Sequence, residues 1–292
     1  MRWHATVIKR FNQSYPSSAC TAQVVTDAGI GYLKALESPE GRHILACEFV
    51  GTCLAEWFHL PTFDHTVIEV DAEVIEIPFF DRNNKQVGKA SNGPAFITRG
   101  EAGDSWSGKA EQLKKLANPH DISRLVVFDT WTLNCDRYCE RPLGQEGKPR
   151  VNRNNVFLSE EAPSGQFMLK AMDHTHCFTC GGELTTRLRR DDKIKEPRVF
   201  GLFPEFRQFL DQDAVQHAVP ALQKFNQTVI QEITGRIPDK WEVSAAIRKA
   251  LDDLVVGRAA FVAETIFAKL WPQADLGFGD VQTDVDSNDA TH

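Results

Sequence analysis

The order of strand-like and helix-like patterns along this chain is the feature that most restricts its fold. Residues 5–11 and 20–26 read as strands, and a tight turn at 27–29 leads into a return strand over 31–36. A single helical pattern follows over residues 42–60, where apolar side chains recur every three or four positions. The first part of the chain is therefore expected to be rich in strands, with one inserted helix.

The remainder of the chain is dominated by helical patterns. Two further strand patterns occupy residues 66–70 and 73–77, and the stretch 81–104, rich in Asn, Gly and Lys, reads as a long connection. The helical patterns cover residues 107–117, 121–133, 204–235 and 239–270. Between them lies an irregular stretch, residues 134–200, which holds the most unusual polar sequences of the chain.

This order predicts an α+β fold with two lobes. We expect a strand-rich N-terminal lobe over residues 1–98 and a larger, mostly helical C-terminal lobe over residues 99–272. The remaining residues, 273–292, are acidic and polar, and their composition predicts a disordered tail.

Composition and charge restrict the class of protein further. Hydrophobic residues make up 42% of the 292-residue chain, which is enough to bury a sizeable core. The formal net charge of −7 gives no global positive field, so we expect no direct binding of nucleic acid. No apolar run reaches the roughly 20 residues that span a bilayer, and the N-terminus lacks the apolar core of a secretory signal. We therefore expect a soluble, cytoplasmic protein without a membrane span.

The cysteines allow two interpretations. There are seven, and the four at Cys135, Cys139, Cys177 and Cys180 could be read as a zinc site. An odd number of cysteines in a chain of this size argues against a disulfide framework. Because spacing alone is a weak signal, we interpret these residues as reduced cysteines and expect no zinc.

Three polar segments carry the residues best suited to chemistry. In the first, residues 128–137, an apolar helix end runs directly into a polar N-x-D-R sequence. In the second, residues 152–158, asparagines precede a short apolar strand. In the third, residues 167–174, an apolar strand delivers Asp173 to a turn-like sequence.

Phosphoryl transfer from ATP explains this order of an acid, an amide and a second acid. The acceptor hydroxyl needs a carboxylate within reach that orients it and accepts its proton. The triphosphate needs Mg²⁺, which prefers hard oxygen ligands such as carboxylate and amide oxygens. Asp136, an asparagine of the second segment and Asp173 meet these needs in the order that protein kinases use.

Each of these residues also has an ordinary explanation when it is considered alone. Asp136 can cap a helix, asparagines are common in turns, and Asp173 can simply end a strand. Only their joint order favours a catalytic site. The metal-binding asparagine can be Asn152, Asn154 or Asn155, and we choose Asn155 because the apolar strand follows it directly.

Two charged residues upstream match this interpretation. Lys34 lies in a strand between apolar neighbours, and Glu48 lies beside the apolar face of the following helix. An ion pair between them would aim the ammonium group at the phosphates of ATP. The alternative is an exposed lysine and a solvated glutamate, and Glu56 on the same helix is a rival partner for Lys34.

Several of these sequences resemble those of HipA-like kinases. The run C-E-F-V-G-T-C-L-A at 47–55 looks like a helix of that family. The segment 128–137, with Asn155 and the M-D-H sequence at 172–174, resembles its catalytic core and also the D-R-x-x-x-N variant of phosphoinositide kinases. The resemblance covers roughly residues 20–180. It implies a two-lobed protein-kinase-like fold.

The resemblance also implies roles for individual residues. Lys34 would contact the phosphates of ATP, and Glu48 would hold Lys34 in place. Asp136 would be the catalytic carboxylate, and Asn155 and Asp173 would be the Mg²⁺ ligands. The family usually has its asparagine shortly after the catalytic aspartate, whereas 19 positions separate the two here. The intervening sequence therefore reads as an inserted loop.

The resemblance implies a function of a definite class. We expect an ATP- and Mg²⁺-dependent phosphotransferase, a HipA-like serine/threonine protein kinase that acts on a hydroxyl group of a protein substrate. Such a kinase could also have an antitoxin-like partner. A lipid kinase of the phosphoinositide type is the alternative within the same class. A non-catalytic pseudokinase or partner-binding module is the alternative outside it.

Overall fold

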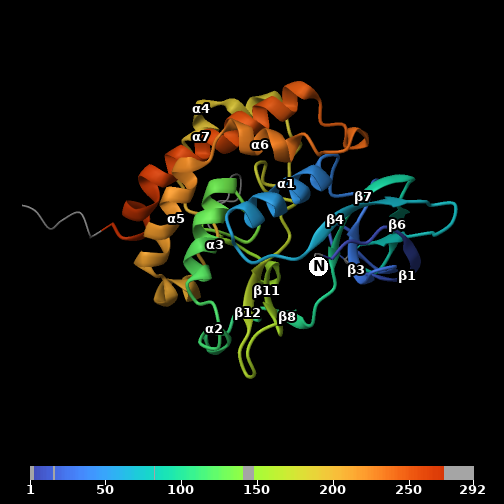
Figure 1. Ribbon diagram of the computed structural model, residues 1–292, viewed down its shortest axis with the longest axis horizontal. Coiled ribbons are helices and arrows are strands. Elements are labelled where there is room, and N and C mark those ends of the chain that lie inside the picture. Colours follow the sequence, from blue (N-terminus) through green and yellow to red (C-terminus); the bar gives the residue numbers. More distant parts are fainter. Residues whose placement is uncertain (1–2, 16, 82, 141–147, 273–292) are drawn as a thin grey trace, which may run out of the picture.

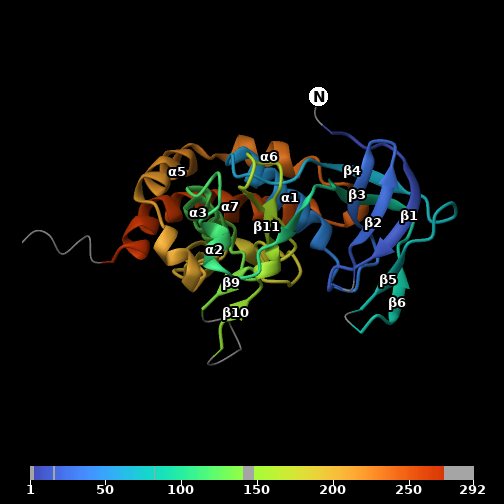
Figure 2. The ribbon, with the colours of Figure 1, turned by 90° about the horizontal axis from the view of Figure 1, so that it is seen from below.

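The computed structural model describes residues 3–15, 17–81, 83–140 and 148–272. Figures 1 and 2 show a strand-rich N-terminal part and a C-terminal part made mainly of helices. The mixed fold predicted from the order of patterns is therefore confirmed. Among the helices within these ranges, none is long and apolar enough to cross a membrane. The predicted tail, residues 273–292, lies outside the described residues.

The N-terminal part is built on a five-stranded antiparallel sheet in the order β1-β2-β3-β7-β4. Its strands are β1 (Ile8–Ser14), β2 (Ala22–Thr26), β3 (Gly29–Lys34), β4 (His65–Val70) and β7 (Gly93–Arg99). Buried and half-buried residues alternate along β2, as expected for a strand with one face on the core. Lys34 ends β3, where it pairs with Phe96 of β7.

Two expectations for this part of the chain were wrong. Residues 73–77 form a turn and irregular backbone, and the strand follows as β5 (Pro78–Phe80). The stretch 81–104 is more than a connection, because it contains β6 (Gln86–Lys89), the inner strand β7 and the start of β8 (Gly103–Ser105). The first five residues of β7 are all buried, so its sequence lacks the alternation that identifies a half-exposed strand.

The inserted helix, α1 (Ile44–Trp57), lies between the sheet and the C-terminal helices, and its residues 44–55 are all buried. It contacts both β7 and α6 (Gln227–Thr234). At Gly51 the helix approaches the segment after β12 so closely that a Cβ atom would lie 2.5 Å from the Cβ of His174. A side chain at this position would push α1 away from that segment.

The C-terminal part packs its helices around one large apolar core. These helices are α2 (Ala110–Leu113), α3 (Asp121–Thr132), α4 (Asp191–Ile194), α5 (Gln212–Lys224), α6 and α7 (Ala245–Leu270). The predicted helix over 107–117 shortens to α2. The one over 204–235 divides into a 3₁₀ segment (Pro204–Phe209), α5 and α6. The division follows from capping, since the Asn226 side chain accepts hydrogen bonds from the backbone N–H groups of Thr228 and Val229.

Short strands support the polar segments between α3 and α5. Strands β8, β11 (Val156–Ser159) and β12 (Met168–Ala171) form a three-stranded antiparallel sheet. Strands β9 (Tyr138–Cys139) and β10 (Arg150–Val151) pair at the base of the predicted insertion. Its middle, residues 141–147, lies outside the described residues.

Candidate functional site

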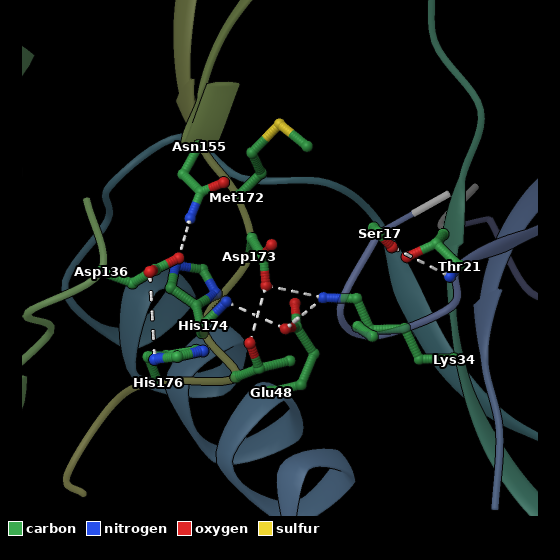
Figure 3. Close-up of polar contacts among 12 residues, drawn as sticks. Ser17, Thr21, Lys34, Glu48, Asp136, Asn155, Met172, Asp173, His174 and His176 are labelled. Carbon is green, nitrogen blue, oxygen red and sulfur yellow. Dashed lines mark hydrogen bonds and ion pairs between the residues drawn. The ribbon is translucent and has the colours of Figure 1, made fainter. Parts of the chain in front are cut away.

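Lys34, Glu48 and Asp173 form one chain of ion pairs, although they come from three distant parts of the sequence (Figure 3). The Nζ atom of Lys34 lies 2.7 Å from Oε2 of Glu48 and 2.9 Å from Oδ1 of Asp173. Sequence reasoning anticipated the first pair. The rival partner, Glu56, instead lies near His65, with 3.7 Å between Oε1 and Nδ1.

The electrostatics of these three groups follow from burial and mutual attraction. Burial lowers the pKa of Lys34, but the charges of Asp173 and Glu48 outweigh this effect and raise it overall. Burial raises the pKa of Asp173, but the adjacent ammonium group of Lys34 more than offsets it and holds the pKa below its usual range. Burial also raises the pKa of Glu48, and Lys34 offsets only part of that effect. Lys34 is therefore charged at neutral pH and faces an ionised Asp173.

The backbone around Asp173 is held in an unusual conformation. Asp173 has a φ of +59°, in the left-handed region that residues with a side chain seldom adopt. The next backbone N–H, that of His174, donates a 2.9 Å hydrogen bond to Oε2 of Glu48. The hydroxyl of Thr175 donates a 2.9 Å hydrogen bond to Oδ1 of Asp173. Glu48 thus fixes both the ammonium group and the turn that carries the acid.

Both carboxylate oxygens of Asp136 have polar partners, hydrogen-bond donors at Oδ2 and cationic side chains at Oδ1. The side-chain amides of Asn155 and Asn152 donate to its Oδ2 over 2.8 and 3.0 Å. Arg150 forms an ion pair with Oδ1, and Nδ1 of His176 lies 4.0 Å from the same oxygen. Because Arg150 already occupies Oδ1, a hydroxyl group that approaches this acid has to share or displace the guanidinium group.

The three candidate metal-binding asparagines differ in burial and in hydrogen bonding. Asn154 is exposed, whereas Asn155 is buried and Asn152 is half-buried. The amide nitrogen of Asn155 is used by Asp136, and within the described residues its Oδ1 accepts no hydrogen bond. The Oδ2 atom of Asp173 is likewise without a hydrogen-bond donor there, and its carboxylate is ionised. One carboxylate and one amide oxygen are the hard donors that Mg²⁺ prefers, so these residues fit that ion.

Sequence reasoning missed the groups that face Asp136 from the side opposite to the asparagines. Arg150 lies in the stretch interpreted as an inserted loop, and His176 follows Asp173 by three positions. His176 also contacts Glu40, with 3.0 Å between its Nε2 and Oε1 of the carboxylate. The only available signal was the D-H-T-H sequence, which has no periodicity and so gave no reason to select one histidine.

The four candidate zinc cysteines do not converge. The thiol of Cys180 contacts that of Cys135, which lowers the pKa of Cys180 to about 7. The Sγ atom of Cys177 instead donates to Oγ1 of Thr132 over 3.6 Å. Over the described ranges, no three His, Cys, Asp or Glu residues are arranged to hold a metal ion.

We therefore keep the prediction that the protein binds no structural zinc. Elemental analysis of the purified protein should find far less than one zinc ion per chain. Removing trace metal with a chelator should leave the melting temperature unchanged, since structural zinc normally contributes to folding. A stoichiometric zinc content would contradict this prediction.

A family model described as HipA-like kinase matches residues 7–259. The chain belongs to the HipA-like kinase family. Its fold is also similar to the crystal structure of a Helicobacter pylori proinflammatory kinase, CtkA, with a TM-score of 0.56. That alignment covers 92% of this chain and 98% of the other at 11% sequence identity, so it speaks for the fold alone. No protein of curated function matches the chain.

Membership in the HipA-like kinase family bears directly on the candidate site. The matched range includes Lys34, Glu48, Asp136, Asn155 and Asp173. The family resemblance inferred from the short sequences is thereby confirmed, and it extends well beyond them on the C-terminal side, as far as α7. Family membership by itself assigns no role to any of these residues.

Proposed function

We propose that this HipA-like kinase is an active phosphotransferase that uses ATP and Mg²⁺ to phosphorylate a hydroxyl group of a protein. The observation that carries the proposal is the chain of ion pairs from Glu48 through Lys34 to Asp173. In this interpretation the sheet with α1 forms a nucleotide-binding lobe, and the helical part forms a catalytic lobe. The reaction would take place between them.

Each residue of the site would then have one task. Lys34 would hold the phosphates of ATP, and Glu48 would keep its ammonium group in position. Asn155 and Asp173 would hold Mg²⁺, which neutralises phosphate charge when it is bound. Asp136 would orient the acceptor hydroxyl and accept its proton, as a general base does. The amides on Oδ2 of Asp136 fix the direction in which its other oxygen points.

Phosphoryl transfer to cellular proteins tests this function. The purified protein is incubated with γ-labelled ATP, Mg²⁺ and a whole-cell lysate whose own kinases have been inactivated. We expect label on serine or threonine residues of a small number of proteins, identified by mass spectrometry. The label should be absent with a chelator of Mg²⁺ and with the Asp136→Asn variant. A wild-type protein that binds Mg-ATP but labels nothing would support a non-catalytic module instead.

A further inference from the structure

The arginine of the N-x-D-R sequence is a buried charge to which the proposed reaction gives no role. Arg137 is fully buried, and its Nε donates a 2.7 Å hydrogen bond to Oδ2 of Asp129 on α3. Its Nη1 donates to the backbone carbonyl of Asn155 and, over 3.0 Å, to that of Met172, which precedes Asp173. One side chain thus joins the two segments that carry the oxygen ligands.

The partner of this arginine is itself connected to the proposed catalytic acid. The side-chain amide of Asn134 donates to Oδ1 of Asp129 over 3.1 Å. The Oδ1 atom of Asn134 accepts a 3.3 Å hydrogen bond from the backbone N–H of Asp136. Gly201, with a φ of +74°, packs against the same carboxylate, and a Cβ there would collide with Oδ2 of Asp129. Arg137, Asn134 and Gly201 therefore enclose the Asp129 carboxylate.

A contribution to stability does not account for such an arrangement. Asp129 and Arg137 are both fully inaccessible to solvent, and burying two charges costs about as much as their attraction returns. Burial also raises the pKa of Asp129, and the charge of Arg137 offsets only part of that effect. In addition, Nη2 of Arg137 has no hydrogen-bond partner within the described residues. Apolar side chains of similar volume would serve stability equally well.

We propose that Arg137 is a positioning residue that holds the Asn155 and Asp173 segments against the loop that carries Asp136, an inference that rests on the proposed phosphotransferase function. Its planar guanidinium group can donate to Asp129 and to two carbonyl oxygens at once. The distance between the hydroxyl-binding acid and the metal ligands is then set by one rigid group. Outer-shell contacts of this kind commonly determine how well ligands bind a metal ion.

The Arg137→Lys variant tests this role. A lysine can still pair with Asp129, but its single ammonium group lacks the planar fork that spans the carbonyls of Asn155 and Met172. We expect activity per folded molecule to fall by about 10–100-fold. The Mg²⁺ concentration needed for half of the full rise in melting temperature with ATP, which measures binding without turnover, should rise as well. A residue with a purely structural role would change the folded fraction and leave this Mg²⁺ requirement unaltered.

The matched control is Arg258→Lys. Arg258 is also fully buried, and it donates to the carbonyls of Ile194 and Glu196 over 3.1 and 2.7 Å and to those of Thr130 and Trp131 on α3. None of these hydrogen bonds reaches the segments of Asn155 or Asp173, which Arg137 joins. This variant should lose stability but keep its rate per folded molecule and its Mg²⁺ requirement. If Arg137→Lys does not fold, Asn134→Ala takes its place, and the same two changes are expected to a smaller degree.

The outcomes separate this inference from the proposed function. An active wild type together with an Arg137→Lys variant of normal rate and normal Mg²⁺ requirement would overturn the positioning role alone. Equal losses of rate per folded molecule in Arg137→Lys and Arg258→Lys would overturn it too. A wild type that transfers no phosphoryl group would overturn the proposed function, and the inference with it.

Discussion

Replacing Lys34 by methionine should reduce phosphoryl transfer by at least about 100-fold, the effect expected when a preorganised charge at a transferring group is removed. Lys34 is the group that contacts both Glu48 and Asp173, so its loss leaves the buried carboxylate of Glu48 and the half-buried carboxylate of Asp173 without their shared cation. Removing one partner of a buried pair typically costs about 3–5 kcal/mol of folding stability. Glu48→Gln should have a milder effect, because Lys34 would still be present and paired with Asp173.

The rate of the Lys34→Met variant has to be compared per folded molecule, because stability falls too. Circular dichroism gives the folded fraction, and labelled ATP gives the rate. Lys170→Met is a matched control, because the side chains of Lys170 and Lys34 are both 11% exposed and Lys170 pairs with the buried Glu101. This control should lose stability without a comparable loss of transfer. Full transfer activity in folded Lys34→Met would rule out its role at the phosphates.

The two acids of the site should fail in different ways when each is changed to asparagine. Asp173→Asn removes a carboxylate from the proposed metal site, so this variant should lose most of its Mg-ATP binding. Asp136→Asn removes the proposed proton acceptor and should bind Mg-ATP normally. Both variants should lose transfer, Asp136→Asn by about 10²–10⁴-fold, the usual contribution of general base catalysis.

Thermal unfolding with and without Mg-ATP measures this difference. A ligand that binds only the folded protein stabilises it by about 2.7 kcal/mol at a hundredfold excess over its Kd. The melting temperatures of wild type and Asp136→Asn should therefore rise by similar amounts, whereas that of Asp173→Asn should barely change. Identical responses of the two variants to Mg-ATP would contradict this division of roles.

Three of the candidate site residues could be selected from the sequence because each lies at or just beyond the end of a recognisable apolar element. Lys34 ends a strand, Asp136 follows an apolar helix, and Asp173 follows a buried strand. The order of these elements was enough to suggest the chemistry. That Lys34 and Asp173, 139 positions apart, are in contact could come only from the family resemblance or from the structure.

The groups that surround Asp136 could not be predicted, for a physical reason. Arg150 opens the two-residue strand β10 and His176 lies in a turn, and neither segment is long enough to show a periodicity that reveals which way a side chain points. Arg137 was visible in the sequence, but a buried arginine and an exposed one look the same there. Its burial depends on Asp129, eight positions earlier on α3.

The errors in the fold have a similar origin. The inner strand β7 was interpreted as part of a connection because Gly93 and Pro94, which suggest a loop, open a strand whose first residues are all buried. The helical pattern over 204–235 hid a break, because apolar positions recur on both sides of the Asn226 cap. Tertiary burial decided the first case and a single side-chain cap decided the second.

Labelling ATP at two positions separates phosphoryl transfer from other reactions at this site. The protein, Mg²⁺ and its acceptor are incubated in parallel with ATP labelled at the γ-phosphate and with ATP labelled at the α-phosphate. We expect the γ label to become attached to protein, while the α label stays in solution as ADP. Attachment of the α label would mean nucleotidyl transfer on the same scaffold, and a protein fraction that carries neither label would mean that the site does not catalyse transfer.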